Sequence, residues 1–86
     1  MPMVPPFWFK QRQGKAEPAG TDMYRLTAPN LAEAFIGIRA ADGGRWRAVL
    51  RSAADGPDVA VTDVQYDDPD DAWGAAFELY RTHVVT

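Results

Sequence analysis

The 86-residue sequence contains no cysteine, a single histidine and no long run of apolar residues. Because cysteine is absent, disulfides, thiol catalysis and zinc–cysteine sites are excluded. No segment approaches the roughly 20 consecutive apolar residues of a membrane-spanning helix, and residues 1–10 lack the basic start and apolar core of a signal peptide. These absences predict a cytoplasmic protein that has no membrane partner.

Catalytic motifs are equally scarce. The sequence has no glycine-rich loop that leads from a strand into a helix and could bind phosphate. His83 is the lone imidazole, and no nucleophile or second ligand accompanies it. A single sheet with one helix rarely provides the pocket that a reaction needs. We therefore expect no enzyme activity and no cofactor.

An excess of positive charge is missing as well. The net charge is −3, and residues 57–86 hold most of the acidic groups, with Arg81 as the only basic residue among them. An acidic total disfavours general attraction to nucleic acid, although a local basic face is compatible with binding it. Hydrophobic residues make up 47% of the chain, which predicts a packed core rather than global disorder.

Residues 67–85 carry the clearest secondary-structure signal. Asp68 can cap a helix, and Pro69 suits the first helical position because its missing N–H would have no helical partner. Apolar residues then recur with helical spacing, at Trp73, Ala76, Phe77, Tyr80 and Val84. Gly74 is unfavourable inside a helix, so we expect it to permit a close approach to the sheet or to an aromatic ring.

Four aspartates surround the predicted start of this helix, at Asp67, Asp68, Asp70 and Asp71. Oxygen ligands at alternate positions suit calcium. Pro69 interrupts the run, however, and no glutamate closes a calcium-binding loop. Capping and the helix dipole account for these carboxylates, so we expect no metal site.

The chain before the helix predicts a small antiparallel sheet. The strands are expected at 35–40, 45–52 and 59–66, with a fourth at 23–28 in the larger version. Their side chains alternate between two faces, and glycine-containing turns separate them. The predicted fold is α+β: a three- or four-stranded antiparallel sheet packed on one C-terminal helix, in the order βββα.

The alternation also predicts which side chains meet the helix. In the strand 45–52, Trp46 and Leu50 share the face that should contact it. In the strand 59–66 the facing is ambiguous, and we favour the set that keeps Asp63 in water. The members of that set are Ala60, Thr62, Val64 and Tyr66.

Residues 1–20 are interpreted as an extended arm and linker rich in proline and aromatic residues, and residues 21–86 as a single domain. The aromatic residues of the arm are Phe7, Trp8 and Phe9. They either cover the edge of the domain's own core or anchor a partner, because exposed aromatic side chains are unfavourable unless something covers them. The sequence leaves both interpretations open.

Four arginines are predicted on the sheet face away from the helix, namely Arg39, Arg45, Arg47 and Arg51. Guanidinium groups bind phosphate or carboxylate in a forked geometry, so this face is the candidate nucleic-acid site. The alternative is a solvated face whose arginines pair with nearby carboxylates, since an antiparallel sheet with one wet face needs polar side chains there.

The order and spacing resemble the pattern of AP2/ERF and integrase arm-type DNA-binding domains. The matching segments are FIGIR (35–39), GRWRAVLR (44–51) and YDDPDDAWGAAFELY (66–80). The resemblance implies a three-stranded sheet, backed by one helix, that enters a DNA major groove. It places Arg39 and Arg51 where the family has DNA-contacting arginines. Ile36 stands where the family has another arginine, and the expected arginine and tryptophan of the third strand are missing.

We therefore expect a small non-enzymatic protein-interaction domain, with self-association through the aromatic arm as one form of that interaction. Its partner would be an unknown protein or a second copy of the chain. The alternative is a nucleic-acid-binding domain that uses the arginine-lined sheet face.

Overall fold

The computed structural model describes residues 5–20, 22–53, 56–62 and 65–85. Its elements are, in chain order, α1 (Phe7–Gln11), β1 (Lys15–Gly20), β2 (Met23–Thr27), β3 (Ala34–Ala41), η1 (Asp42–Gly44), β4 (Arg45–Arg51), β5 (Asp58–Val61), α2 (Pro69–Tyr80) and η2 (Arg81–Val85). η1 is a 3-10 turn, and η2 is one turn of π-helix that continues α2. Within the described ranges, every helix is too short or too polar to cross a bilayer.

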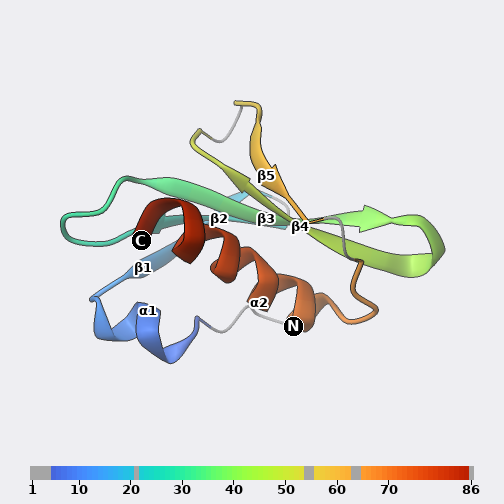
Figure 1. Ribbon diagram of the computed structural model, residues 1–86, viewed down its shortest axis with the longest axis horizontal. Coiled ribbons are helices and arrows are strands. Elements are labelled where there is room, and N and C mark those ends of the chain that lie inside the picture. The colour runs from blue at the N-terminus through green and yellow to red at the C-terminus, as the bar shows by residue number, and fades with distance from the viewer. Residues whose placement is uncertain (1–4, 21, 54–55, 63–64, 86) are drawn as a thin grey trace.

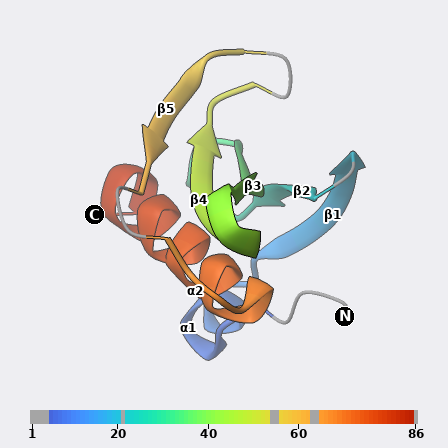
Figure 2. The same cartoon turned by 90° about the vertical axis from the view of Figure 1, so that its right-hand side faces the viewer.

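The strands form one antiparallel sheet in the order β1-β2-β3-β4-β5 (Figure 1). α2 packs across β3 and β4, so the predicted α+β class with a C-terminal helix on a sheet is confirmed. The described part of the chain has five strands instead of the three or four expected. Figure 2 shows both helices on one side of the sheet, with the outer strands bending toward the other side. We call that other side, which includes Arg39, Val49 and Arg51, the open face.

Residues 15–20 form the edge strand β1. The prediction of a linker is therefore wrong for these residues. Ala16 lies opposite Leu26 of β2 and packs against the core. Pro18 is compatible with β1 because an edge strand leaves one side without ladder partners. The polar, proline-containing composition that suggested a linker is therefore that of a solvated edge strand.

Both outer strands of the sheet are irregular. The register of β1 on β2 shifts between Pro18 and Gly20. The register of β5 on β4 shifts at Leu50 and Arg51. Such bulges bend a strand and interrupt its ladder, which is common at sheet edges.

Residues 7–11 also differ from the predicted extended arm, because they form α1. The backbone is extended at Pro6, with φ −69° and ψ 158°, and the helix begins immediately after it. A proline just before the first turn removes no helical hydrogen bond. Phe9 is buried in the core, and this contact stabilises a helix that is too short to persist alone.

The turn between β3 and β4 forms as predicted. Gly43 and Gly44 have φ of 74° and 75°, values that glycine adopts without steric conflict. The turn fixes the register of the two longest strands, so that Arg39 lies opposite Arg47 and Phe35 opposite Arg51.

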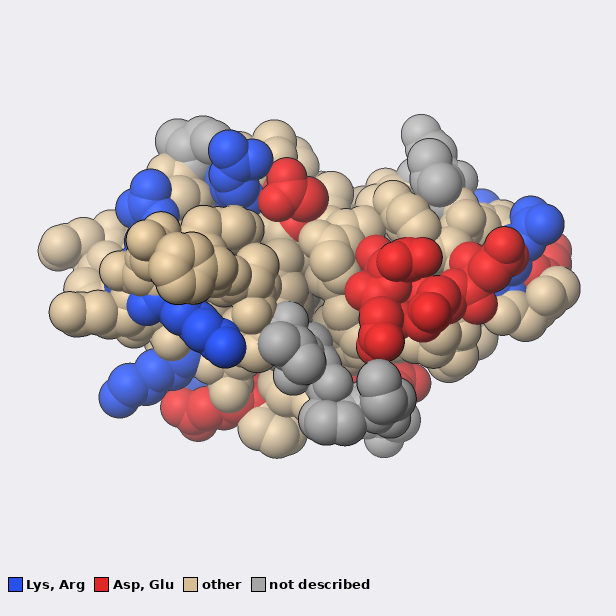
Figure 3. Space-filling view, turned by 90° about the horizontal axis from the view of Figure 1, so that it is seen from below, with Lys and Arg blue, Asp and Glu red and all other residues tan. Residues whose placement is uncertain are grey.

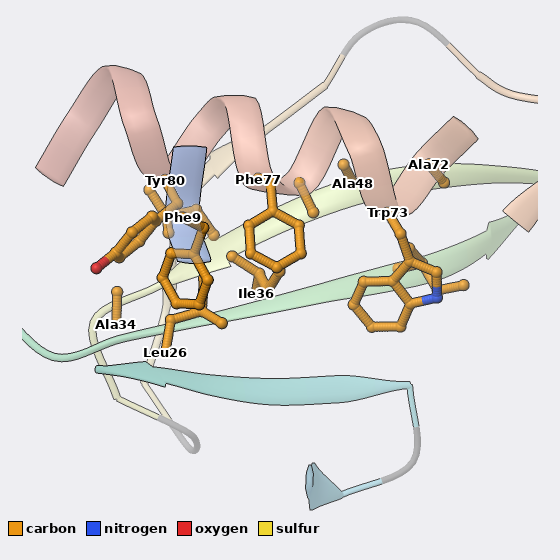
Figure 4. Packing of buried hydrophobic residues seen from close by; sticks show 12 residues of the cluster. Phe9, Leu26, Ala34, Ile36, Ala48, Ala72, Trp73, Phe77 and Tyr80 are labelled. Carbon is orange, nitrogen blue, oxygen red and sulfur yellow. The ribbon is translucent and has the colours of Figure 1, made fainter. Parts of the chain in front are cut away.

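The core fills the space between α2 and the sheet (Figure 4). Its buried side chains are Phe9, Leu26, Ala34, Ile36, Ile38, Ala48, Leu50, Ala72, Trp73, Ala76, Phe77 and Tyr80. Trp46 packs against the same cluster, so the predicted meeting of the Trp46 and Leu50 face with the helix stripe is confirmed. Trp73 also makes an edge-to-face contact with Tyr24, at 5.3 Å between ring centroids.

The glycine that permits a close approach is Gly37, not Gly74 as predicted. Gly74 is exposed, and no atom lies within 4 Å of where its Cβ would be. At Gly37 of β3 a Cβ would lie 2.8 Å from the carbonyl oxygen of Asp22. That carbonyl accepts a hydrogen bond from the amide of Ile38 at 3.1 Å. The β1–β2 turn therefore rests directly on β3.

The last predicted strand is shorter than expected. β5 ends at Val61, and Tyr66 then forms an isolated bridge with Trp46, each amide donating to the other's carbonyl at 2.8 Å. Between them, the hydroxyl of Thr62 accepts a hydrogen bond from the amide of Ala48 at 3.1 Å. A side-chain oxygen thus replaces a backbone carbonyl in the ladder, which interrupts the strand.

The predicted facing of this segment is confirmed at Ala60 and Tyr66, which pack against the core. Asp63 and Val64, which were expected to face water and the helix respectively, lie outside the described residues.

Candidate interaction surfaces

Asp58 of β5 joins two of the predicted arginines on the open face. Its Oδ2 accepts from the Nη2 of Arg39 at 2.8 Å, and its Oδ1 accepts from the Nε of Arg51 at 2.7 Å. The hydrogen bonds from Arg39 and then Arg51 lower the pKa of the Asp58 carboxyl below its ordinary value. All three side chains are partly exposed, at 24% for Asp58, 47% for Arg39 and 25% for Arg51. Charge-assisted bonds of this kind hold both guanidinium groups in one orientation.

The other two predicted arginines do not join this group. Arg45, at the start of β4, donates to the carboxylate of Asp67 at 3.1 Å, near the N-terminus of α2. Arg47 lies opposite Arg39 and makes no ion pair with a residue that the structure describes. The predicted set of four arginines is therefore split between the open face and the tip of the β3–β4 hairpin.

Two hollows open on this face, and Arg39 borders both. The smaller has a volume of about 170 Å³ and is lined by Met23, Gly37, Arg39, Val49 and Arg51, among others. The larger has a volume of about 260 Å³, with Arg39, Arg47, Val61 and Gln65 in its lining. Val49 is only 4% exposed although no helix covers it, because the stems of long polar side chains shield apolar neighbours.

Carboxylates pair with arginines on both flanks of the open face. On the β1–β2 side, Arg25 pairs with Glu17 at 3.1 Å and with Glu33 at 3.9 Å. On the β4–β5 side, Asp58 is the partner of Arg39 and of Arg51. Asp22 also lines the smaller hollow and Asp42 the larger, so carboxylate residues lie on both flanks.

Sequence reasoning missed Asp58, which it assigned to a turn. The relevant signal is the pairing of β4 with β5, which sets Val49 opposite Val61. Counting back from Val61 with a regular register would place residue 59 opposite Arg51. The bulge moves Asp58 into that position, and no local sequence pattern announces a bulge here.

The aromatic residues of α1 divide between the core and the surface. Phe9 is 1% exposed and contacts the rings of Phe77 and Tyr80, at 5.3 and 5.8 Å between centroids. Trp8 stacks on Tyr80 with a centroid distance of 6.4 Å. Phe7 is 73% exposed. Of the two interpretations left open above, own-core packing therefore applies to Phe9 and Trp8.

The surface seen in Figure 3 carries both signs of charge, in unequal amounts at its two ends. Carboxylates gather at the end where α2 begins, and basic side chains gather toward the end that carries α1. Asp68, at the N-terminus of α2, accepts a hydrogen bond from the amide of Asp70 at 2.9 Å, which confirms the predicted helix cap. In the described part of the chain, no three His, Asp or Glu side chains are grouped so that they could hold a metal ion.

No family model, curated protein or solved structure matches the chain. A function is therefore inferred from the two surfaces described above: α1 with its outward-facing Phe7, and the open face with its arginines.

Proposed function

We propose that this protein is a non-enzymatic protein-interaction domain that self-associates through α1. The observation that carries the proposal is the contrast between two aromatic residues of this short helix: Phe9 is 1% exposed, whereas Phe7 is 73% exposed. Aromatic side chains are enriched among the residues that contribute most to protein interfaces.

The packing of α1 supports the same conclusion. Phe9 and Trp8 both contact Tyr80 of α2, so the orientation of α1 is fixed before any partner arrives. A side chain presented from a fixed element loses less conformational freedom on binding than one on a flexible arm. Phe7 is therefore a pre-positioned anchor for a second copy of the chain.

The proposal is tested by sedimentation velocity over a range of protein concentrations. We expect the mean sedimentation coefficient of the wild type to rise with concentration and that of Phe7→Ser to stay at the monomer value. Val59→Ser is the matched control, because Val59 is the other exposed large hydrophobic residue in the described ranges, at 54%. A wild type that is monomeric at every concentration, or equal behaviour of the two variants, would contradict the proposal.

Nucleic-acid binding is the second candidate function. Arg47 favours it, because among the described residues it has no carboxylate partner. Arg39 and Arg51, which the family resemblance assigns to DNA contact, are both hydrogen-bonded to Asp58, and this carboxylate disfavours contact with phosphate. A steep loss of affinity for duplex DNA with rising salt would support the second candidate. Absence of binding at low salt would end it.

A further inference from the structure

A further hollow lies where η2, at the end of α2, meets the sheet. Its volume is about 200 Å³, and its apolar lining consists of Ala32, Ala34, Leu50, Val59 and Val84. Ala34 and Leu50 belong to the core and are 2% and 1% exposed, whereas Val59 is 54% exposed. The hollow therefore extends from the surface to side chains of the core.

The charged side chains in the lining of this hollow do not favour an ionic ligand. The charged and titratable residues there are Glu33, Arg51 and His83. Arg51 is hydrogen-bonded to Asp58, and Glu33 lies 3.9 Å from Arg25. The carboxylate and the guanidinium group thus each have a partner of opposite charge within the chain. An apolar, uncharged group is the occupant that the rest of the lining favours.

The size of the hollow suits a single aromatic ring. An engineered cavity of about 150 Å³ lined by apolar side chains binds benzene, whereas pockets for drug-sized molecules measure roughly 300–1,000 Å³. At about 200 Å³ the hollow is closer to the first of these values. It has room for the ring of one phenylalanine but not for a whole nucleotide or cofactor.

Phe7 provides an aromatic ring that its own chain leaves uncovered. Among the described residues, the large hydrophobic side chains that remain exposed are Phe7, at 73%, and Val59, at 54%. Because Phe7 is so exposed, it does not occupy the hollow of its own chain. A contact between Phe7 of one copy and the hollow of another would remove both exposed side chains from water together.

A symmetric contact between two α1 helices is disfavoured by charge. Residues 1–16 contain three charged side chains, Lys10, Arg12 and Lys15, and all three are basic. None of them makes an ion pair with a residue that the structure describes. In an isologous interface these cations would lie against their own copies and repel each other. A contact between α1 and a different surface avoids this arrangement.

We propose that the ring of Phe7 enters this hollow in a second copy of the chain. Ala34, Leu50 and Val84 then surround the ring, and Val59 contacts its edge. The contact joins two different surfaces, so a pair of chains joined once still has one free Phe7 and one free hollow. This inference rests on the proposed self-association and names the surface that receives α1.

Filling the hollow tests the assignment. Ala32 is exposed and lines the hollow, so Ala32→Phe places a ring there without altering a buried residue. In sedimentation velocity this variant should self-associate roughly ten-fold more weakly than the wild type, whereas Ala32→Ser, the matched control, should behave as the wild type. Thermal melting confirms that each variant is folded. If Ala32→Phe melts at a lower temperature than the wild type, His83→Trp fills the hollow from η2 instead.

Mixing two variants provides the sharpest measurement. Phe7→Ser has lost the ring but keeps an open hollow, and Ala32→Phe keeps Phe7 but has a filled hollow. At a concentration where each is monomeric alone, the mixture should form a 1:1 heterodimer that grows no further. In a ¹H–¹⁵N correlation spectrum of labelled Phe7→Ser, the amide signals of Ala34, Leu50 and Val84 should shift when unlabelled Ala32→Phe is added. Unlabelled Phe7→Ser should leave them in place.

Val59→Ser should weaken self-association less than Phe7→Ser does. Val59 borders the hollow with more than half of its side chain already in water. Its replacement by serine leaves Ala34, Leu50 and Val84 in place, whereas Phe7→Ser removes the whole inserted ring. If Val59→Ser abolished self-association while Phe7→Ser did not, the proposal would be overturned.

The remaining outcomes separate the failure of this inference from the failure of the proposed function. If Ala32→Phe associates like the wild type while Phe7→Ser is monomeric, α1 binds another surface, so the inference fails and the proposed function stands. The inference also fails if both variants are monomeric and their mixture is too. If toluene shifts the amide signals of the hollow and Ala32→Phe does not, the occupant is a free apolar molecule and the inference fails. A wild type that is monomeric at every concentration would overturn both.

Discussion

Gly14 lies against the face of the Phe9 ring. A Cβ at Gly14 would lie 2.5 Å from Cζ of that ring, with two further ring atoms at 2.6 and 2.7 Å. The amide of Gly14 also donates to the carbonyl of Phe9 at 3.0 Å. This glycine therefore allows the chain to turn from α1 into β1 while Phe9 stays in the core.

Gly14→Ala is accordingly expected to destabilise the protein. The added methyl group must displace a ring that is 1% exposed and packed against Phe77 and Tyr80, and overpacking of a core costs about 1–3 kcal/mol. Urea unfolding followed by tryptophan fluorescence measures the change. A Gly14→Ala variant with wild-type stability would show that the Phe9 ring has room to move.

Gly74→Ala is expected to act in the opposite direction. Gly74 is an exposed interior position of α2, and a Cβ there would contact nothing. Alanine is better than glycine inside a helix by about 1 kcal/mol, largely because it restricts the unfolded chain. The same urea titration should show a higher midpoint with an unchanged slope. A lower midpoint would indicate that this face of α2 is in contact with something.

Trp73→Ala is expected to unfold the protein or to cost about 3–5 kcal/mol. Trp73 is 7% exposed and contacts the ring of Tyr24 of β2 as well as the sheet under α2. That loss is a large share of the stability of a small domain. Phe7→Ala is the control, since it removes an exposed ring and should leave the melting temperature of the monomer unchanged. Equal melting temperatures for the two variants would contradict the packing of α2.

Tyr80→Phe is expected to leave stability unchanged or to raise it by up to about 1 kcal/mol. The side chain is fully buried, and its hydroxyl has no hydrogen-bond partner among the described residues. A buried polar group without a partner is unfavourable, and removing it relieves that cost. A clear loss of stability in chemical unfolding of Tyr80→Phe would reveal a partner for the hydroxyl.

The same residue predicts an alkaline limit to stability. Burial raises the pKa of the Tyr80 phenol above its ordinary value of 10.0, and the charge of Arg12 lowers it by a smaller amount. The folded state thus favours the neutral phenol. The contribution of Tyr80 to the free energy of unfolding is therefore complete below pH 10.0 and is lost as the pH rises through the raised pKa of the folded state. In Tyr80→Phe the melting temperature should fall less steeply over this range than in the wild type.

The helix and the central strands could be predicted because their signals are local. Asp68 caps its own helix two residues away, and Gly43 and Gly44 sit in the turn that they require. β1 could not be predicted in this way. Ala16 is the only apolar side chain of β1 that packs on the core, and the strand exists because it pairs with β2. Tertiary context decides such segments more than propensity does.

The sequence predicts which residues form the candidate surfaces, but it does not predict which side chains these residues pair with. Simple alternation along β4 places Arg47 and Arg51 on the face away from the helix. Their partners depend on how neighbouring strands align, and the bulge that brings Asp58 opposite Arg51 leaves no mark in composition. Likewise, nothing local distinguishes Phe7 from Phe9. Only the docking of α1 on α2 sends one ring inward and the other outward.

The irregular outer strands have a consequence for the behaviour of the protein in concentrated solution. β1 carries Pro18, which has no amide hydrogen to offer, and breaks its register beside it. β5 is four residues long and begins at a bulge. A neighbouring molecule therefore finds no continuous row of peptide groups at either border of the sheet with which to extend it. Contact between folded copies must run through side chains, so assemblies formed by crowding should dissolve on dilution instead of seeding fibrils.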